Sequence, residues 1–378
     1  MMKITKVEAI PCTIPRKGGG MGSNVVLVKI HTDEGIIGAA DGGTCGQDNV
    51  MLAIKQWEPV LIGADPMDIG LIVNNMLRSF THNGAAMGIV DFALHDIVGK
   101  ALNMPVYQYL GGKACEKLGI GMMISHGTAL ERARIAETVV ENGVTNIVCK
   151  VGPGWGTTVF DDVANIKAIR DAVGYEVLLG VDANGGLDYS TALDLALRLE
   201  EFKLYKVEQP VPTWDYDGLR RLRNKLHTPV WAHESAVEIP GLLECIKKDA
   251  TDGACIKVVW TGGIYQSRKW AAIAEAANLA ITCGSMVGSG YEASAQAHFL
   301  AADPWMTKFA HANLGPPLLH NQWDTTNPPI TEDLSKNPPV FKDGYFYPPD
   351  GPGLGLELND EIIPRLITTG KAPISYGN

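Results

Sequence analysis

The sequence predicts an α/β protein built on a parallel β/α barrel, together with a second domain. Eight short apolar runs alternate with amphipathic segments, a pattern typical of parallel βα units. Three carboxylates follow successive apolar runs at equal steps of 26 residues, which is the length of one strand, one helix and two loops. A chain of 378 residues with 46% hydrophobic content is also long for one ordinary domain.

The order of the predicted elements places the barrel in the second part of the chain. Residues 3–11 and 25–39 are expected to form strands, the second with a hairpin turn at Asp33-Glu34-Gly35, and 50–110 is mainly helical. No helix is evident after the last strand, and 314–353 is rich in proline and glycine. The expected barrel strands lie near 118–125, 145–150, 177–182, 204–208, 229–233, 253–258, 280–285 and 307–312.

The equally spaced carboxylates are Asp182, Glu208 and Glu234, in VLLGVDAN, YKVEQP and TPVWAHES. At the C-terminal ends of successive barrel strands they would converge on the face where barrel active sites form. Hard oxygen donors with open positions suit Mg²⁺. Solvated loop acids are the alternative in a chain with 42 acidic residues, but equal spacing after apolar strands favours a metal site.

Two lysines flank this triplet, Lys150 in TNIVCKVG and Lys257 in GACIKVVWTGG. On the barrel hypothesis they follow the strands before Asp182 and after Glu234, and so face each other across the pocket. A single lysine at a strand end is more often solvated or paired in a salt bridge. A pair beside one dication is different, because the cation disfavours the protonated amines and lets a lysine act as a base.

These motifs resemble the enolase superfamily, in the branch of mandelate racemases and muconate-lactonizing enzymes, whose lysine or histidine bases work with Mg²⁺. The resemblance runs nearly end to end, and the order and spacing of the motifs make it specific. The motifs that carry it are KVG at 150–152, VDANGG at 181–186, VEQP at 207–210, AHES at 232–235, IKVVWTGG at 256–263, VDFALHDIVGKALNMPVYQYLGG at 90–112 and PPDGPGLGLEL at 348–358.

The resemblance implies a (β/α)7β TIM-like barrel with an α+β capping domain formed by the N-terminal region and the C-terminal segment. The implied boundaries are 1–115 for the cap, 116–325 for the barrel and 326–378 for the segment returning to the cap. It also implies a Mg²⁺-dependent enzyme that removes the proton α to a substrate carboxylate through an enediolate. Two facing lysines favour a racemase or epimerase; a cycloisomerase or an acid-sugar or hydroxy-acid dehydratase is the alternative, and a non-catalytic metal-binding barrel a distant one.

Two departures from the family pattern concern the site itself. The muconate-lactonizing branch has Lys-x-Lys where this chain has Val148-Cys149-Lys150, so the lysine that assists its neighbour by repulsion is absent. His233 occupies the place of the usual aspartate ligand, whereas the 26-residue step selects Glu234, as in the mandelate-racemase branch. The sequence thus combines racemase-like metal spacing with muconate-like lysines.

Substrate contacts are predicted less sharply. Glycine-rich loops of the cap close over the substrate in the resembled family, and strand ends supply further contacts. The candidates are Asn184, His233, Met21, Asn24, His311 and Asn313.

Composition limits the partners and the compartment. A formal charge of −10 argues against a nucleic-acid partner, which would require a basic face. No leader-like opening and no long apolar run point to secretion or a membrane span. Seven cysteines without a CxxC pair fit a reducing cytoplasm. The expected partner is therefore a small-molecule carboxylate, in a protein expected to be a homo-oligomer.

Overall fold

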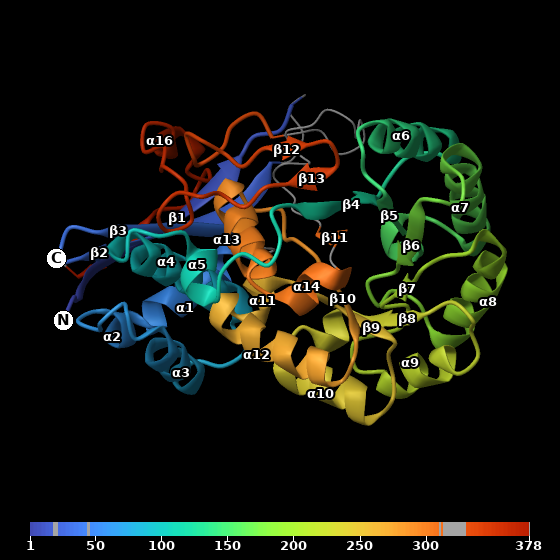
Figure 1. Cartoon of the computed structure of the whole chain (residues 1–378), viewed down its shortest axis with the longest axis horizontal. Coiled ribbons are helices and arrows are strands. Elements are labelled where there is room, and N and C mark those ends of the chain that lie inside the picture. The colour runs from blue at the N-terminus through green and yellow to red at the C-terminus, as the bar shows by residue number, and fades with distance from the viewer. Residues whose placement is uncertain (18–21, 44–45, 310, 313–329, 378) are drawn as a thin grey trace.

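The computed structural model describes residues 1–17, 22–43, 46–309, 311–312 and 330–377. Figure 1 shows two parts, a barrel formed by the middle of the chain and a cap on which both termini lie. No helix in these ranges is long and apolar enough to cross a membrane.

An antiparallel sheet forms one layer of the cap. Its strands are β1 (Ile4–Ile14), β2 (Ser23–Thr32), β3 (Ile37–Gly43) and β14 (Ile374–Gly377), in the order β14-β1-β2-β3. The predicted hairpin is confirmed: β2 and β3 pair antiparallel, and the glycine at its turn, Gly35, has φ +78°. Pairing of β14 with β1 brings the C-terminal segment back onto the first strand.

The helical layer of the cap connects this sheet to the barrel. Helix α4 (Gly84–Ala101) packs against β3 and against the barrel helices α11 (Val258–Thr261) and α12 (Gly263–Ala276), and is buried along most of its length. Gly84 and Gly88 permit the close approach, because a Cβ on either would lie 1.9 Å and 2.2 Å from the carbonyl oxygens of Trp260 and Val259. The cap helices are α1 (Gln47–Gln56), α2 (Glu58–Leu61), α3 (Ile69–Ser79), α4 (Gly84–Ala101) and α5 (Val106–Leu110).

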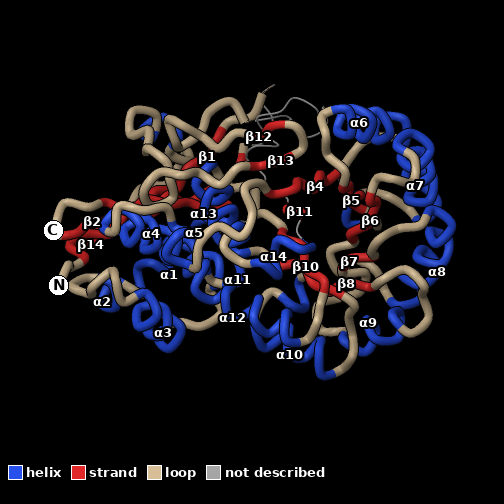
Figure 2. Tube along the Cα trace, viewed as in Figure 1, coloured by secondary structure: helices blue, strands red, loops and turns tan. Residues whose placement is uncertain are grey.

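In the described residues, eight parallel strands form the barrel, and Figure 2 shows them as a ring inside the helices. Each strand pairs with the next, and β11 pairs with β4 to close the ring. The predicted barrel with its α+β cap is thereby confirmed. The strands are β4 (Leu118–Ile124), β5 (Asn146–Lys150), β6 (Leu178–Asp182), β7 (Val207–Glu208), β8 (Val230–Ala232), β9 (Gly253–Ile256), β10 (Ala280–Cys283) and β11 (His311–Ala312).

Two barrel helices begin at a threonine whose side chain caps the first turn. Thr128 and Thr158 each form a capping box with the acidic residue three positions on, Glu131 and Asp161, which fixes the starts of α6 and α7. The helices are α6 (Ala129–Glu141), α7 (Val159–Val173), α8 (Tyr189–Leu199), α9 (Tyr216–Arg223), α10 (Ile239–Lys247), α11 (Val258–Thr261), α12 (Gly263–Ala276), α13 (Gly290–Ala301) and α14 (Pro304–Phe309).

The expected strand at 307–312 is partly wrong. Residues 307–309 belong to α14, and only His311 and Ala312 pair as β11. Asp303 explains the helix, because its side chain accepts hydrogen bonds from the amides of Trp305 (2.8 Å) and Met306 (3.1 Å). Proline at the first helical position then favours a helix over a strand.

The C-terminal segment touches both parts of the molecule. The short strands β12 (Phe341–Lys342) and β13 (Tyr345–Phe346) form a hairpin, and β13 pairs antiparallel with the barrel strand β4. Helix α16 (Ile363–Leu366) then leads back to β14 in the cap.

Candidate active site

Five polar side chains predicted from the sequence lie at the C-terminal ends of five successive strands. Lys150 ends β5 and pairs in register with Asp182 at the end of β6, which in turn pairs with Glu208 at the end of β7. Glu234 begins a 3₁₀ turn just beyond β8, and Lys257 directly follows β9. The barrel therefore places the two lysines on opposite flanks of the three carboxylates.

Lys150 is held by polar partners and by one ring. Its Nζ lies 2.5 Å from Oδ2 of Asp182 and donates to Oδ1 of Asn184 at the same distance. The ammonium also lies 5.1 Å from the centre of the Trp155 ring, within cation–π range. Its side chain is thus fixed at the pocket by contacts from three directions.

Asn184 connects the two sides of the carboxylate cluster. Its backbone has φ +47°, and its amide N–H donates to Oδ1 of Asp182 (2.8 Å). Its Nδ2 donates to Oε1 of Glu234 (2.8 Å), so one side chain bridges Lys150 and Glu234. Its predicted contact with substrate stays a prediction, but the structure gives it a positioning role.

Glu208 lies between two basic groups. Lys206, 1% exposed, forms an ion pair with Oε2, and Nδ1 of His233 lies 2.9 Å from Oε1. Burial alone would raise the pKa of Glu208, but the Lys206 charge and the His233 contact outweigh it and hold that pKa well below its usual range. Lys206 was missed by the sequence reasoning, although the two-residue period of a strand turns it to the same side as Glu208.

The other two carboxylates differ in their electrostatics. Burial raises the pKa of Asp182, repulsion from Glu208 adds to the rise, and Lys150 opposes it. For Glu234 the effect of burial is outweighed by His233 and then Lys257, which lower its pKa. Lys257 also has its Nζ 4.3 Å from the centre of the Trp260 ring. Each lysine therefore interacts with one carboxylate and lies over one tryptophan.

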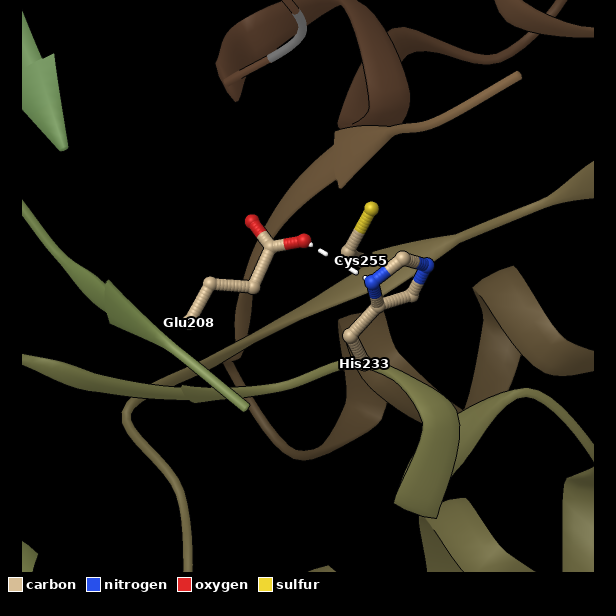
Figure 3. Close-up of side chains that lie close together, drawn as sticks. All are labelled: Glu208, His233 and Cys255. Atoms are coloured by element: carbon tan, nitrogen blue, oxygen red, sulfur yellow. Dashed lines mark ion pairs between the residues drawn. The ribbon is translucent and has the colours of Figure 1, made fainter. Parts of the chain in front are cut away.

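The structure contains the donors that a cation would need. Burial and then repulsion from Glu208 raise the pKa of Asp182, and Oε2 of Glu234 is buried without a hydrogen bond within the described chain. Both features fit a cation held by carboxylate oxygens. Among the described residues, one group of three potential ligands has donor atoms within 4.8 Å of one another, namely Glu208, His233 and Cys255 (Figure 3).

Of the remaining residues predicted to contact substrate, the structure describes only some. Asn24 is exposed on β2, and its Oδ1 accepts a hydrogen bond from Thr13 Oγ1 (2.9 Å). His311 lies in β11, but its side chain is outside the described set. Met21 and Asn313 lie outside the described residues altogether.

Comparison with known proteins identifies the family to which the chain belongs. The model for the mandelate racemase / muconate lactonizing enzyme N-terminal domain matches residues 4–111, and that for the enolase C-terminal domain-like fold matches residues 131–362. The chain belongs to the mandelate racemase / muconate lactonizing enzyme family of the enolase superfamily. The resemblance inferred from the motifs is thereby confirmed.

Individual members of the family cover nearly the whole chain. N-succinyl-L-Arg/Lys racemase of Bacillus cereus is 30% identical over 97% of this chain and 98% of its own, and chloromuconate cycloisomerase of Pseudomonas putida is 28% identical over 89% and 90%. The crystal structure of a family protein from Azoarcus sp. EbN1 is 42% identical, with a TM-score of 0.92 over 99% of both chains. More relatives in the family are epimerases and a dehydratase, so its enzymes span several reactions.

Proposed function

We propose that this protein is a racemase or epimerase that removes the proton α to a substrate carboxylate and returns it from the opposite face. The observation that carries the proposal is the placement of Lys150 and Lys257 on strands that flank the carboxylates. A base on each flank is what inversion at carbon requires, because one amine takes the proton and the other supplies it. The N-succinyl-L-Arg/Lys racemase relative supports the same choice.

Asp182, Glu208 and Glu234 would hold the metal ion, for which the chemistry of three buried or half-buried oxygen donors favours Mg²⁺. When bound, a dication there offsets the negative charge that develops on the substrate carboxylate during proton removal. The three carboxylates interact already without a metal, since the pKa of Asp182 is raised by burial and then by the charges of Glu208 and Glu234.

The chain's own residues prepare the proton transfer. Asp182 and Asn184 hold the Nζ of Lys150, and the Trp155 ring covers it from another side. Trp260 plays the corresponding part for Lys257, whose Nζ lies over its ring. Fixed amines reduce the entropy that must be lost on reaching the transition state. In racemisation the two Nζ atoms exchange roles with the direction of the reaction.

A cycloisomerase or dehydratase is the second candidate. It is favoured by the chloromuconate cycloisomerase and arabinonate dehydratase among the relatives. One lysine would then remove or deliver the proton, and the other would stabilise the anion. A homo-oligomeric state and a cytoplasmic location stay predictions from the sequence.

The deciding experiment is proton NMR of the Mg²⁺-loaded protein in D₂O, with N-acyl amino acids, hydroxy acids, sugar acids and muconates as substrates. We expect deuterium at the α-carbon with loss of optical purity. Loss of optical purity should disappear in Lys150→Ala and in Lys257→Ala, and both signals should persist in Lys167→Ala, whose lysine is exposed on α7. An alkene, keto acid or lactone product would assign the second candidate instead. No α-proton exchange on any substrate class, in a protein that binds Mg²⁺, would count against the racemase proposal.

A further inference from the structure

A nitrogen and a sulfur donor lie directly beside the carboxylate cluster. His233 follows β8, and Cys255 lies on β9, two residues before Lys257. Because side chains alternate along a strand, Cys255 faces the same side of β9 as Lys257. Figure 3 shows both side chains close to the Glu208 carboxylate, and the three donor atoms lie within 4.8 Å of one another.

We propose that Glu208, His233 and Cys255 form a second metal site, which takes a borderline divalent cation such as Zn²⁺ or Co²⁺. Imidazole and thiolate select such cations, whereas Mg²⁺ prefers oxygen donors alone. Three protein ligands would leave a further position for water or a substrate atom. The site goes beyond the proposed reaction, which uses neither the imidazole nor the thiol.

The state of His233 is an independent observation in favour of a ligand. The residue is 2% exposed, and neither ring nitrogen makes a hydrogen bond within the described chain. Its Nδ1 nevertheless faces two carboxylates, 2.9 Å from Oε1 of Glu208 and 3.5 Å from Oε1 of Glu234. A proton on Nδ1 can satisfy these carboxylates, and a metal ion bound at Nδ1 would take the place of that proton and keep the buried charges compensated.

A metal ion binds cysteine as the thiolate, so the thiol proton leaves when the ion binds. Burial and the Glu208 charge raise the pKa of Cys255 well above its usual range, so the free thiol keeps its proton until an ion binds. The positive charge of Lys206, whose Nζ pairs with Glu208, opposes that rise and would offset part of the negative charge of the thiolate.

The two metal sites share Glu208, and this step of the inference rests on the proposed function. A cation on Glu208, His233 and Cys255 takes a carboxylate that the Mg²⁺ set needs. Borderline cations are therefore expected to compete with Mg²⁺ for the pocket, and so to inhibit α-proton exchange.

Cobalt binding tests the site without substrate. Co²⁺ added to the metal-free protein should give a thiolate-to-cobalt charge-transfer band. Cys255→Ser should abolish the band. His233→Asn should weaken Co²⁺ binding by roughly 10- to 100-fold or more, because the loss of a residue that only supports a metal ligand already costs that much. Cys283→Ser is the matched control, since Cys283 is equally buried on the adjacent strand but pairs in register with Ile256, on the other face of the sheet.

X-ray absorption of the Zn²⁺-loaded protein provides a second readout. We expect one sulfur neighbour at about 2.3 Å in the wild type and in Cys283→Ser, and none in Cys255→Ser. A shell of nitrogen and oxygen alone in the wild type, or a band that survives Cys255→Ser, would overturn the proposal. Because neither readout uses substrate or Mg²⁺, failure here is distinguishable from failure of the proton-exchange experiment.

Discussion

Lys206 and Glu208 form a buried ion pair that would tune Glu208 as the metal ligand proposed above. Lys206 is enclosed by the rings of Trp231 and Tyr205, 4.9 Å and 5.4 Å from its Nζ, and pairs with Oε2 of Glu208. The lysine therefore lowers the negative charge that Glu208 offers to a cation. In the metal-free protein it also compensates a carboxylate that would otherwise be buried with the His233 contact alone.

Lys206→Met should destabilise the metal-free protein by roughly 3–5 kcal/mol, because it leaves Glu208 as a largely uncompensated buried charge. Bound Mg²⁺ would replace the missing positive charge. We therefore expect saturating Mg²⁺ to raise the thermal midpoint of Lys206→Met more than that of the wild type, as measured by scanning calorimetry. Lys167→Met, a change of an exposed lysine, should respond to Mg²⁺ like the wild type. Equal increments in all three proteins would refute this role of Lys206.

For single residues, the sequence indicated which carboxylates lie at the strand ends better than it indicated which side chains they contact. Spacing selected Asp182, Glu208 and Glu234, since strand–helix repeats impose a regular step. Lys206 could have been inferred as well, because the two-residue period of a strand turns it to the same side as Glu208. The contact of His233 with Glu208 could not, because it depends on how the chain turns after β8 into the 3₁₀ segment.

Helix α6 positions the end of strand β5 through one buried guanidinium. Arg132 is 1% exposed and donates to the carbonyl oxygens of Lys150 (2.9 Å), Gly127 (3.0 Å) and Ser125 (3.2 Å). These bonds connect the loop after β4, the first turn of α6 and the strand end that carries Lys150. The helix thus contributes to the site through the backbone at the end of β5.

Arg132→Met should lose hydrogen bonds to a charged group that are worth roughly 1.5–3 kcal/mol, and it should also release the Lys150 backbone. We expect α-proton exchange, measured by NMR well below the unfolding temperature, to fall about 10- to 100-fold. Arg134→Met changes an exposed arginine of the same helix and should affect neither quantity. Exchange at the wild-type rate in a destabilised Arg132→Met protein would restrict Arg132 to a structural role.

Among the elements, the strands were predicted well where an apolar run ended in a polar residue, as at Lys150 and Asp182. The error at 307–309 has a local cause, because Asp303 and Pro304 form a helix start that outweighs the apolar residues after it. That start signal was present in the sequence. The short β11 is defined by closure of the ring on β4, a long-range pairing that no local pattern encodes.

On the scale of the whole molecule, the cap and the barrel meet at buried carboxylates. Asp41, on the cap strand β3, accepts hydrogen bonds from the amide (2.8 Å) and hydroxyl (2.7 Å) of Ser289, just before α13. Glu292 accepts from the amides of Gly43 (2.8 Å) and Gly288 (2.9 Å), and so holds the cap to the loop after β10. Asp41 and Ser289 are 248 residues apart, and Gly43 and Glu292 are 249 apart, so no local pattern in the sequence indicates this junction.

The junction should make the stability of the protein depend on pH. Burial raises the pKa of Asp41 from 3.8 to about 7, hydrogen bonds from Ser289 oppose the rise, and Glu292 and Asp333 add to it. The folded protein therefore binds this proton more tightly than the unfolded chain. The resulting stabilisation is complete below pH 3.8 and is lost as the pH rises to about 7.

Asp41→Asn removes the titrating group, so the wild type should lose stability relative to this variant between about pH 4 and about pH 7, by up to roughly 4 kcal/mol. The measurement is the difference in thermal midpoint between the two proteins across that range. Other groups that titrate alike in both proteins shift the two thermal midpoints equally, so their contribution cancels in the difference. Asp68→Asn, a change of the same kind at an exposed position before α3, is the control. A flat difference for Asp41→Asn would mean that Asp41 stays ionised at the junction throughout, and that its Ser289 hydrogen bonds outweigh burial.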